Sequence, residues 1–246
     1  MVASHSQYRS QIYSDYLSQV MPQWRDLADE HYLRWAHAYR ARLRGWLPAD
    51  RDERCLDLGC GPGNVLFLLR GFGYQQVEGV DLSAECVRQA RRFSPAVTQS
   101  GAAEYLRGAA PGYRLITAFD LLEHLGKDEL LDLLQAVYAA LAPGGVFIAQ
   151  VPNAASPWGL QVRYGDLTHE LAFDPAGLRK IFQMAGFAGF EARECGPAPG
   201  SAAGVVRWAA WQVLRGLLVL WNLVETGATG GSTYTRIFLA KVVKPL

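Results

Sequence analysis

The stretch Cys55-Leu56-Asp57-Leu58-Gly59-Cys60-Gly61-Pro62-Gly63-Asn64 decides the fold. An apolar strand runs into a turn with three glycines, and the apolar residues 65–69 begin a helix. Glycine lets the backbone turn sharply and come close to a ligand. The unpaired N–H groups at the start of the helix face the same space. The pattern therefore predicts an α/β unit with a ligand at the end of its first strand.

The next apolar stretch, residues 76–80, ends in the acid Asp81. A carboxylate at the end of the second strand is suited to hold the two hydroxyls of a ribose. The alternative for Asp81 alone is a helix cap or a surface acid. The glycine turn is not the dinucleotide motif G-x-G-x-x-G, because Asn64 stands where the third glycine belongs. Together the two features predict a nucleoside cofactor.

The composition describes a nearly neutral chain with enough apolar residues for a sizeable core. Half of the 246 residues are hydrophobic, and 24 basic residues balance 23 acidic ones. This balance gives no electrostatic reason to expect nucleic acid as a main partner. The four cysteines form no C-x-x-C pair, which favours a reducing, cytoplasmic location. The polar residues 1–7 predict no signal peptide.

Helical and strand-like stretches alternate along most of the chain. Residues 8–47 predict two helices, the second from Asp29 to Trp46. Strands are predicted at 54–58, 76–81, 96–99, 115–119, 146–151, 187–193 and 235–242, with helices at 64–71, 83–93, 127–141 and 175–185. This alternation predicts a parallel sheet with helices on both faces. We divide the chain into an N-terminal helical segment, residues 1–50, and a main domain, residues 51–246, with an apolar helical insertion at 197–232.

Three motifs in this order resemble the class I S-adenosylmethionine-dependent methyltransferases. They are the strand and turn Leu56-Asp57-Leu58-Gly59, the acid Asp81, and Pro143-Gly144-Gly145 before the fifth strand. The resemblance covers about residues 50–194 and the last strand. It implies a methyltransferase that uses S-adenosylmethionine. It also implies an α/β fold with a doubly wound, Rossmann-like sheet of seven strands, the last one antiparallel.

The resemblance further implies roles for residues around the cofactor. Gly59, Cys60 and Gly61 are expected to line its methionine and ribose parts. Asp81 is expected to bind the ribose hydroxyls, and Leu82 to lie against the adenine.

Asp57 is expected to orient the glycine turn, partly through water. Where the family often has Asp-Ala after the third strand, this chain has Ala102-Ala103. The backbone of Ala103 or the side chain of Glu104 would then replace the missing adenine contact. The full predicted cofactor set is Asp57, Gly59, Cys60, Gly61, Gly63, Asp81, Leu82, Ala103 and Asp120.

Asp120, Glu123 and His124 follow the fourth strand in the pattern Asp-x-x-Glu-His. If this segment begins a helix, the three side chains could converge on one point. Two carboxylates and one imidazole suit a divalent ion such as Mg²⁺, Mn²⁺ or Zn²⁺. The alternative is a plain acidic helix start that complements the helix dipole.

The same pattern resembles a metal-binding motif of two methyltransferase branches. One makes the O-methyl ether of a ubiquinone precursor, and the other methylates the 2'-hydroxyl at the 3' end of small RNAs. The RNA branch supplies another histidine after the fifth strand, where His169 stands here. The resemblance implies that Mg²⁺ or Mn²⁺ is held by Asp120, Glu123, His124 and His169, with Asp120 a shorter substitute for glutamate.

The loop after the fifth strand carries the candidate acceptor residues. Ligands of such sheets bind outside the carboxyl ends of the strands, so residues 163–170 are expected beside the cofactor. The run Asp166-Leu167-Thr168-His169, followed by Phe173-Asp174-Pro175, resembles a branch associated with bacterial surface polysaccharide and lipopolysaccharide synthesis. This implies a sugar hydroxyl of a glycan or glycolipid as the methyl acceptor.

The predicted catalytic residues are His169, His124 and Glu123. His169 would act as a general base, or as one ligand of a metal that lowers the pKa of the hydroxyl. Alternatively, His169 only ties down its loop, oriented by the neighbouring Asp166 and Thr168. Candidates for holding the sugar are Arg163, Tyr164 and Trp158.

Three other functions stay open from the sequence. A quinone-type or other phenol O-methyltransferase acting on a small molecule is the first. A methyltransferase of RNA 3' ends is the second, and the neutral charge weighs against it. The third is a non-catalytic partner protein that binds the cofactor.

The apolar stretch 205–224 has about the length of a membrane span, but Arg207, Gln212, Arg215 and Asn222 interrupt it. We interpret it as an amphipathic lid or packing helix. The alternative is a helix on a membrane surface, which would place the protein in the cytoplasm at the inner face of the membrane.

Overall fold

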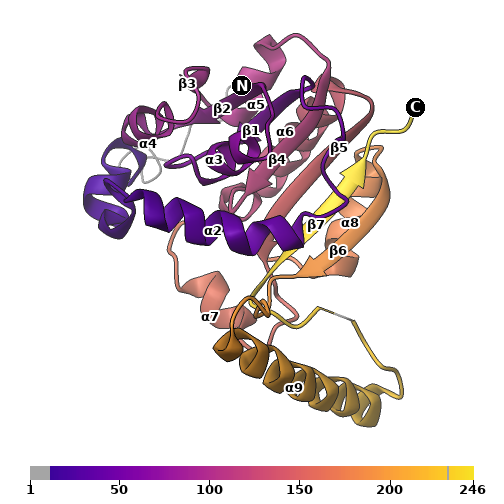
Figure 1. Ribbon diagram of the computed structural model, residues 1–246. Helices are drawn as coiled ribbons and strands as arrows, with labels where there is room; N and C mark the ends of the chain where they lie inside the picture. The colour runs from indigo at the N-terminus through magenta and orange to yellow at the C-terminus, as the bar shows by residue number, and fades with distance from the viewer. Residues whose placement is uncertain (1–11, 232) are drawn as a thin grey trace.

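The computed structural model describes residues 12–231 and 233–246, so the predicted helical residues 8–11 and the polar residues 1–7 lie outside it. Over the described ranges, seven strands form one sheet in the order β3-β2-β1-β4-β5-β7-β6 (Figure 1). Neighbours among β1 to β5 are parallel, while β7 is antiparallel to β5 and to β6. The predicted doubly wound, Rossmann-like sheet with an antiparallel last strand is confirmed. Its strands are β1 Arg54–Leu58, β2 Gln76–Asp81, β3 Val97–Gln99, β4 Tyr113–Phe119, β5 Leu141–Pro152, β6 Ala188–Glu194 and β7 Ile237–Val243.

Helices cover both faces of the sheet because successive strand residues point to opposite sides. Leu56 and Leu58 of β1 pack in one core with α5, α6 and α8. Cys55 packs in the other core with α2, α3 and α4. These helices are α2 Asp29–Arg42, α3 Asn64–Gly71, α4 Ala84–Ala90, α5 Ala102–Gly108, α6 Lys127–Ala140 and α8 Pro175–Met184.

The N-terminal segment is less regular than predicted. Instead of one long helix, its described part has helical residues 12–14, a short π-helix, η1 (Tyr16–Val20), and a 3-10 turn, η2 (Pro22–Trp24). Pro22 cannot donate a backbone hydrogen bond, so a helix cannot continue through it undisturbed. Helix α2 ends at Arg42, earlier than predicted, yet Trp46 is buried in the same core as β1. The N-terminal segment therefore shares a core with the main domain.

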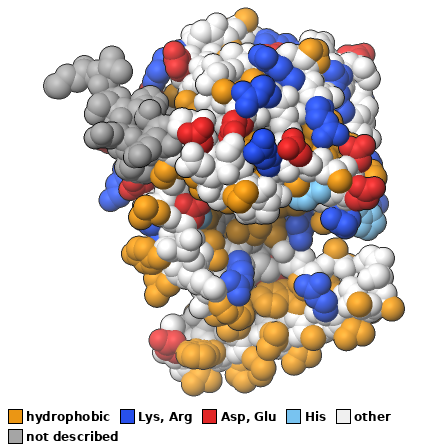
Figure 2. Space-filling model, turned by 90° about the vertical axis from the view of Figure 1, so that its left-hand side faces the viewer, with side chains coloured by type: hydrophobic (Ala, Val, Ile, Leu, Met, Phe, Trp, Pro, Cys, Tyr) orange, Lys and Arg blue, Asp and Glu red, His pale blue; other side chains and the backbone are white. Residues whose placement is uncertain are grey.

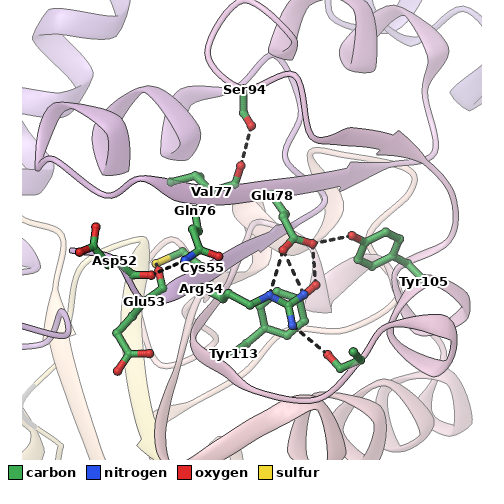
Figure 3. A network of polar contacts seen from close by, with 11 residues as sticks. Asp52, Glu53, Arg54, Cys55, Gln76, Val77, Glu78, Ser94, Tyr105 and Tyr113 are labelled. Atoms are coloured by element: carbon green, nitrogen blue, oxygen red, sulfur yellow. Dashed lines mark hydrogen bonds and ion pairs between the residues drawn. The ribbon is translucent and has the colours of Figure 1, made fainter. Parts of the chain in front are cut away.

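A polar network near the amino ends of the first strands fixes how they lie together (Figure 3). Glu78 of β2 forms an ion pair with Arg54 of β1 at 3.0 Å. It also accepts hydrogen bonds from the hydroxyls of Tyr105 and Tyr113, at 2.8 and 2.7 Å. Burial opposes ionisation of Glu78, but these three donors outweigh it and lower its pKa. Because this network lies at the amino ends, the opposite, carboxyl ends of the strands remain accessible to a ligand.

The predicted turn at residues 143–145 is contained within β5, which starts five residues earlier than expected. Pairing with β4 shifts register between Tyr113 and Leu115, so the strand bulges there. A Cβ on Gly145 would lie 2.9 Å from the carbonyl oxygen of Tyr113. Glycine is therefore required where the two backbones come closest.

The apolar insertion forms one long helix, α9 (Ala202–Thr226), which lies below and apart from the sheet in Figure 1. None of its side chains is buried. The helix also contributes nothing to the large cavity at the carboxyl ends of β1, β2 and β4. The helix therefore does not cover this cavity as a lid, and it packs on the body through partly exposed side chains such as Trp211. By length and composition alone, α9 meets the criterion for a membrane span.

Candidate active site

A cavity of about 900 Å³ opens at the carboxyl ends of β1, β2 and β4, where parallel α/β sheets bind their ligands. Its walls come from the glycine turn, the start of α5, the segment after β4 and the loop after β5. The predicted cofactor residues that line it are Asp57, Gly59, Cys60, Gly61, Asp81, Leu82, Ala103 and Asp120. Gly63 is the one member of this predicted set that does not line the cavity.

The glycines of the turn serve two purposes. Gly59 and Gly61 have left-handed backbones, with φ of 63° and 50°, and a Cβ on Gly61 would meet no neighbouring atom. Gly61 therefore keeps the backbone exposed to the cavity. Gly63, with φ of 97°, precedes α3, and a Cβ there would lie 2.7 Å from the ring of Phe93. Gly63 is thus required for packing.

Asp81 at the end of β2 is held by backbone donors from two sides. Its Oδ2 accepts the N–H of Gly61 at 2.9 Å, and its Oδ1 accepts the N–H of Ser83 at 2.8 Å. Burial raises the pKa of this carboxyl, and the two donors oppose that shift. Each carboxylate oxygen keeps a further lone pair, so Asp81 can also accept hydrogen bonds from two ligand hydroxyls.

Asp57, on β1 beneath the turn, is 1% exposed. The hydroxyl of Thr117 on β4 donates to it at 2.6 Å. Burial raises the pKa of Asp57 to about 7, although the Thr117 hydrogen bond opposes the shift.

The wall expected to face an adenine comes from Leu82 and the start of α5. Leu82 is 39% exposed and lines the cavity beside Ala103 and Glu104. The Ser100 hydroxyl lies 3.4 Å from the Glu104 carboxylate. Both groups predicted to replace the family's aspartate, the backbone of Ala103 and the side chain of Glu104, are therefore at the cavity.

The N-terminal segment closes one side of this cavity. The Glu85 carboxylate of α4 accepts the N–H groups of Leu17 and Ser18, at 2.8 and 3.0 Å, and so fixes η1 in place. The segment and α2 add a largely aromatic wall of Tyr13, Tyr16, Leu17, Met21, Trp24 and Trp35.

Asp120 is placed differently from the prediction. It has a left-handed backbone, with φ of 53°, and does not begin a helix; a 3-10 turn, η3 (Leu122–His124), follows it. Both of its carboxylate oxygens accept from the side-chain amide of Gln150, at 2.9 and 2.8 Å. The hydroxyl of Tyr39 on α2 in turn donates to Gln150. Asp120 therefore faces β5 and stands outside the cluster formed by the three other predicted metal ligands.

Glu123 is 1% exposed and lines the cavity. No described residue hydrogen-bonds to its Oε2 atom. Burial raises its pKa well above the ordinary value, and the negative charge of Asp120 adds to the shift. Its backbone carbonyl accepts the N–H groups of Glu170 and Leu171, at 2.7 and 2.9 Å. Glu123 thereby ties the loop after β5 to the segment after β4.

A relay of hydrogen bonds fixes the tautomer of His124. Burial opposes ionisation of Asp166, but the hydroxyl and N–H of Thr168 donate to it and lower its pKa. Because the Thr168 hydroxyl proton points to Asp166, its oxygen can only accept from His124 Nδ1, which lies 2.9 Å away. The proton of His124 is thus on Nδ1, and the lone pair is on Nε2.

His169 is held in the same tautomer by a different partner. Its Nδ1 lies 3.0 Å from the backbone carbonyl of Val162, on α7 (Gly159–Tyr164), which can only accept. The lone pair of His169 is therefore on Nε2. The rings of His124 and His169 meet edge to face with centroids 4.7 Å apart. Of the two residues predicted to orient His169, Thr168 contacts His124 instead, while the Asp166 carboxylate lies 4.0 Å from His169 Nε2.

Glu123, His124 and His169 converge, with one ligand atom from each lying within 4.8 Å of the others. Such a group can accept a proton from a bound hydroxyl or hold a divalent ion. The three residues proposed to hold a sugar are not brought to the cavity. Tyr164 is 73% exposed, Arg163 donates to the carbonyl of Glu170, and Trp158 lies beneath Arg236.

A family model described as "Methyltransferase domain" matches residues 24–192. The chain belongs to this methyltransferase family. The matched region holds the glycine turn, Asp81 and the Glu123–His124–His169 cluster, so the predicted class of S-adenosylmethionine-dependent methyltransferase is confirmed.

The relatives of this methyltransferase domain are named for different methyl acceptors. A trans-aconitate 2-methyltransferase of Paracidovorax citrulli is 35% identical over 133 residues, or 53% of this chain and 48% of the relative. A malonyl-(acyl-carrier protein) O-methyltransferase of Enterobacter lignolyticus is 39% identical over 118 residues, or 46% and 43%. The chain thus spans about half the length of these relatives. The crystal structure of an S-adenosylmethionine-dependent methyltransferase from Archaeoglobus fulgidus has a TM-score of 0.62 at 21% identity, with 88% of this chain and all of that chain covered.

Proposed function

We propose that this chain is an S-adenosylmethionine-dependent O-methyltransferase that acts on a neutral sugar hydroxyl of a bacterial glycan or glycolipid. The observation that carries the proposal is the Glu123–His124–His169 cluster at the cavity. A hydroxyl is a poor nucleophile until its proton is removed or its oxygen is polarised, and these side chains are suited to both tasks. A carboxylate acceptor is already ionised and needs neither.

The charge of the cavity also supports a neutral acceptor. Its described wall carries nine acidic side chains, some of which, including Asp57 and Glu123, have raised pKa values, and, apart from the histidines, one cationic side chain, Arg107. Arg107 is already paired with Asp132. A polycarboxylate such as the acceptor named for the trans-aconitate relatives would be repelled, since like charges disfavour binding. The acceptors of the named relatives are therefore not carried over to this chain.

His169 is proposed as the general base. Its Nε2 lone pair can accept the hydroxyl proton, and Asp166, ionised and 4.0 Å from Nε2, can stabilise the imidazolium that forms. S-adenosylmethionine, when bound, supplies a methyl group on a positively charged sulfur for in-line displacement. Asp81 and the turn at Gly59 and Gly61 would hold that donor so that its methyl points to the acceptor oxygen.

The cluster also fits a divalent ion. Both histidines donate Nδ1–H to oxygen acceptors, as metal-bound histidines usually do, and Glu123 Oε2 has no donor among the described residues. Without Asp120, the chain would offer three ligands instead of the four predicted. Two imidazole nitrogens and one carboxylate oxygen suit a transition-metal ion such as Mn²⁺ or Zn²⁺ better than Mg²⁺. An ion held there would lower the pKa of an acceptor hydroxyl.

A phenol of the quinone-precursor type is the second candidate acceptor. The wall formed by Trp35, Phe119 and the aromatic residues of the N-terminal segment favours it, because a flat ring can stack there. A phenol ionises more readily than a sugar hydroxyl. Its methylation should therefore depend less on His169.

The testing experiment measures transfer of labelled methyl from S-adenosylmethionine to neutral glycans, phenols and carboxylates. We expect transfer to a hydroxyl acceptor and its loss in His169→Ala. Transfer to carboxylates alone would contradict the proposal. Tight binding of S-adenosylmethionine without transfer to any of these acceptors would favour a non-catalytic, cofactor-binding partner.

A further inference from the structure

Helix α9 turns its polar residues Gln212, Arg215 and Asn222 toward the protein and leaves most of its apolar residues exposed to solvent. The side chains that are only partly exposed recur at helical spacing on the face toward the body, and they are Trp211, Gln212, Arg215, Leu218, Val219 and Asn222. Trp211 Nε1 lies 3.4 Å from the Glu194 carboxylate at the end of β6, and Arg215 pairs with the same carboxylate at 3.8 Å. A helix that packs on a soluble core has the opposite arrangement.

The outward face of α9 is a continuous apolar stripe. Over residues 208–224 the one charged side chain is Arg215, which points inward to Glu194. Figure 2 shows the helix as the lowest part of the molecule, covered largely by hydrophobic side chains. The stripe consists of Val206, Val213, Leu217, Leu220 and Val224, which are 54% to 80% exposed, with Trp221 on its flank at 68%. An exposed apolar surface of this kind marks a binding face.

The connections of α9 exclude a membrane span. Asn153, in the body, donates its side-chain amide to the carbonyls of Thr233 and Thr235, at 3.0 and 2.8 Å. Only residues 227–232 lie between the end of α9 and this anchor. Six residues reach at most about 20 Å, whereas the hydrocarbon core of a bilayer is about 30 Å thick. The far end of α9 must therefore stay on the same side as the catalytic domain.

We propose that α9 lies in the plane of a lipid bilayer, with its stripe inserted among the acyl chains at the membrane surface. The stripe offers no hydrogen-bonding group, and the indole N–H of Trp221 on its flank already donates to Glu225 at 3.0 Å. Acyl chains need no polar partner, whereas a protein interface usually supplies a polar rim. The charged Arg207 and Glu225 stand at the two ends of α9, where they can remain in the headgroup layer.

The experiment is flotation of the full chain with vesicles of phosphatidylcholine, with and without phosphatidylglycerol. The test variant carries Leu217→Glu and Leu220→Glu on the stripe. The matched control carries Leu33→Glu and Met184→Glu, which replace two apolar side chains on α2 and α8 that are at least as exposed as the stripe residues they are matched to, Leu217 and Leu220. Because α9 does not line the cavity, S-adenosylmethionine affinity checks that each variant is folded.

We expect the intact chain and the control to float with vesicles, and the stripe variant to lose about tenfold or more in partition coefficient. An intact chain that stays unbound with both kinds of vesicle would overturn the proposal. A folded stripe variant that floats like the intact chain would do the same. A dimer that the stripe substitutions dissociate, in a chain that does not float, would assign the face to a second copy.

Discussion

Asp81→Ala should weaken S-adenosylmethionine binding about a hundredfold. In the structure the Asp81 carboxylate already accepts the N–H groups of Gly61 and Ser83, which aim its remaining lone pairs at the cavity. Two ribose hydroxyls donating to this charged group contribute about 1.5 kcal/mol each. Their loss, about 3 kcal/mol, corresponds to roughly two decades in Kd.

Isothermal titration calorimetry with S-adenosylmethionine measures this change directly. Asp50→Ala is the matched control, because Asp50 also accepts a backbone N–H, from Asp52 at 2.9 Å, and lies outside the cavity. Asp81→Asn keeps an acceptor oxygen and should fall between the wild type and Asp81→Ala. If folded Asp81→Ala bound as tightly as the Asp50 control, the ribose role of Asp81 would be refuted.

Three further predictions concern the buried carboxyl and the histidine cluster. Asp57 has a pKa of about 7 when folded and an ordinary value of 3.8, so unfolding releases its proton and stability falls as pH rises between these values. Asp57→Asn should remove this fall, which amounts to at most about 4 kcal/mol; urea denaturation that shows the same pH dependence in both proteins would contradict the assignment. Thr168→Val should lower kcat about tenfold with unchanged KM for S-adenosylmethionine, and Thr168→Ser should restore it; equal loss in both would mean that the hydroxyl does not orient His124. If the cluster holds a metal, chelator should abolish transfer and Mn²⁺ should restore it, whereas full activity in chelator would leave His169 as a metal-free base.

The cofactor side of the site could be predicted from the sequence because its residues lie close together along the chain. The strand, the glycine turn and the helix after it occupy one short stretch, and Asp81 ends the next strand of the same parallel pair. In such a unit the sequence order determines where the ligand-facing groups lie.

The acceptor side depends on contacts that sequence spacing does not reveal. Asp120 was assigned to a helical turn, but its left-handed backbone and the amide of Gln150 direct it to β5. The Asp166–Thr168–His124 relay joins two loops that follow different strands. Side chains that meet across strands in this way carry no periodic signal.

The solvent-facing stripe of α9 was also hidden in the sequence. An apolar helix with a few polar residues has the same sequence pattern whether its polar face points to water or to the protein. Only the contacts of Trp211 and Arg215 with Glu194 show which face is turned inward.

The most direct test of the proposed function is the alkali stability of the product. Labelled methyl is transferred from S-adenosylmethionine to a panel of glycans, phenols and polycarboxylates, and the products are then treated with mild alkali. Methylation of a hydroxyl through Glu123, His124 and His169 predicts an ether that keeps its label. Label released as methanol, which marks a methyl ester of a carboxylate, would contradict it.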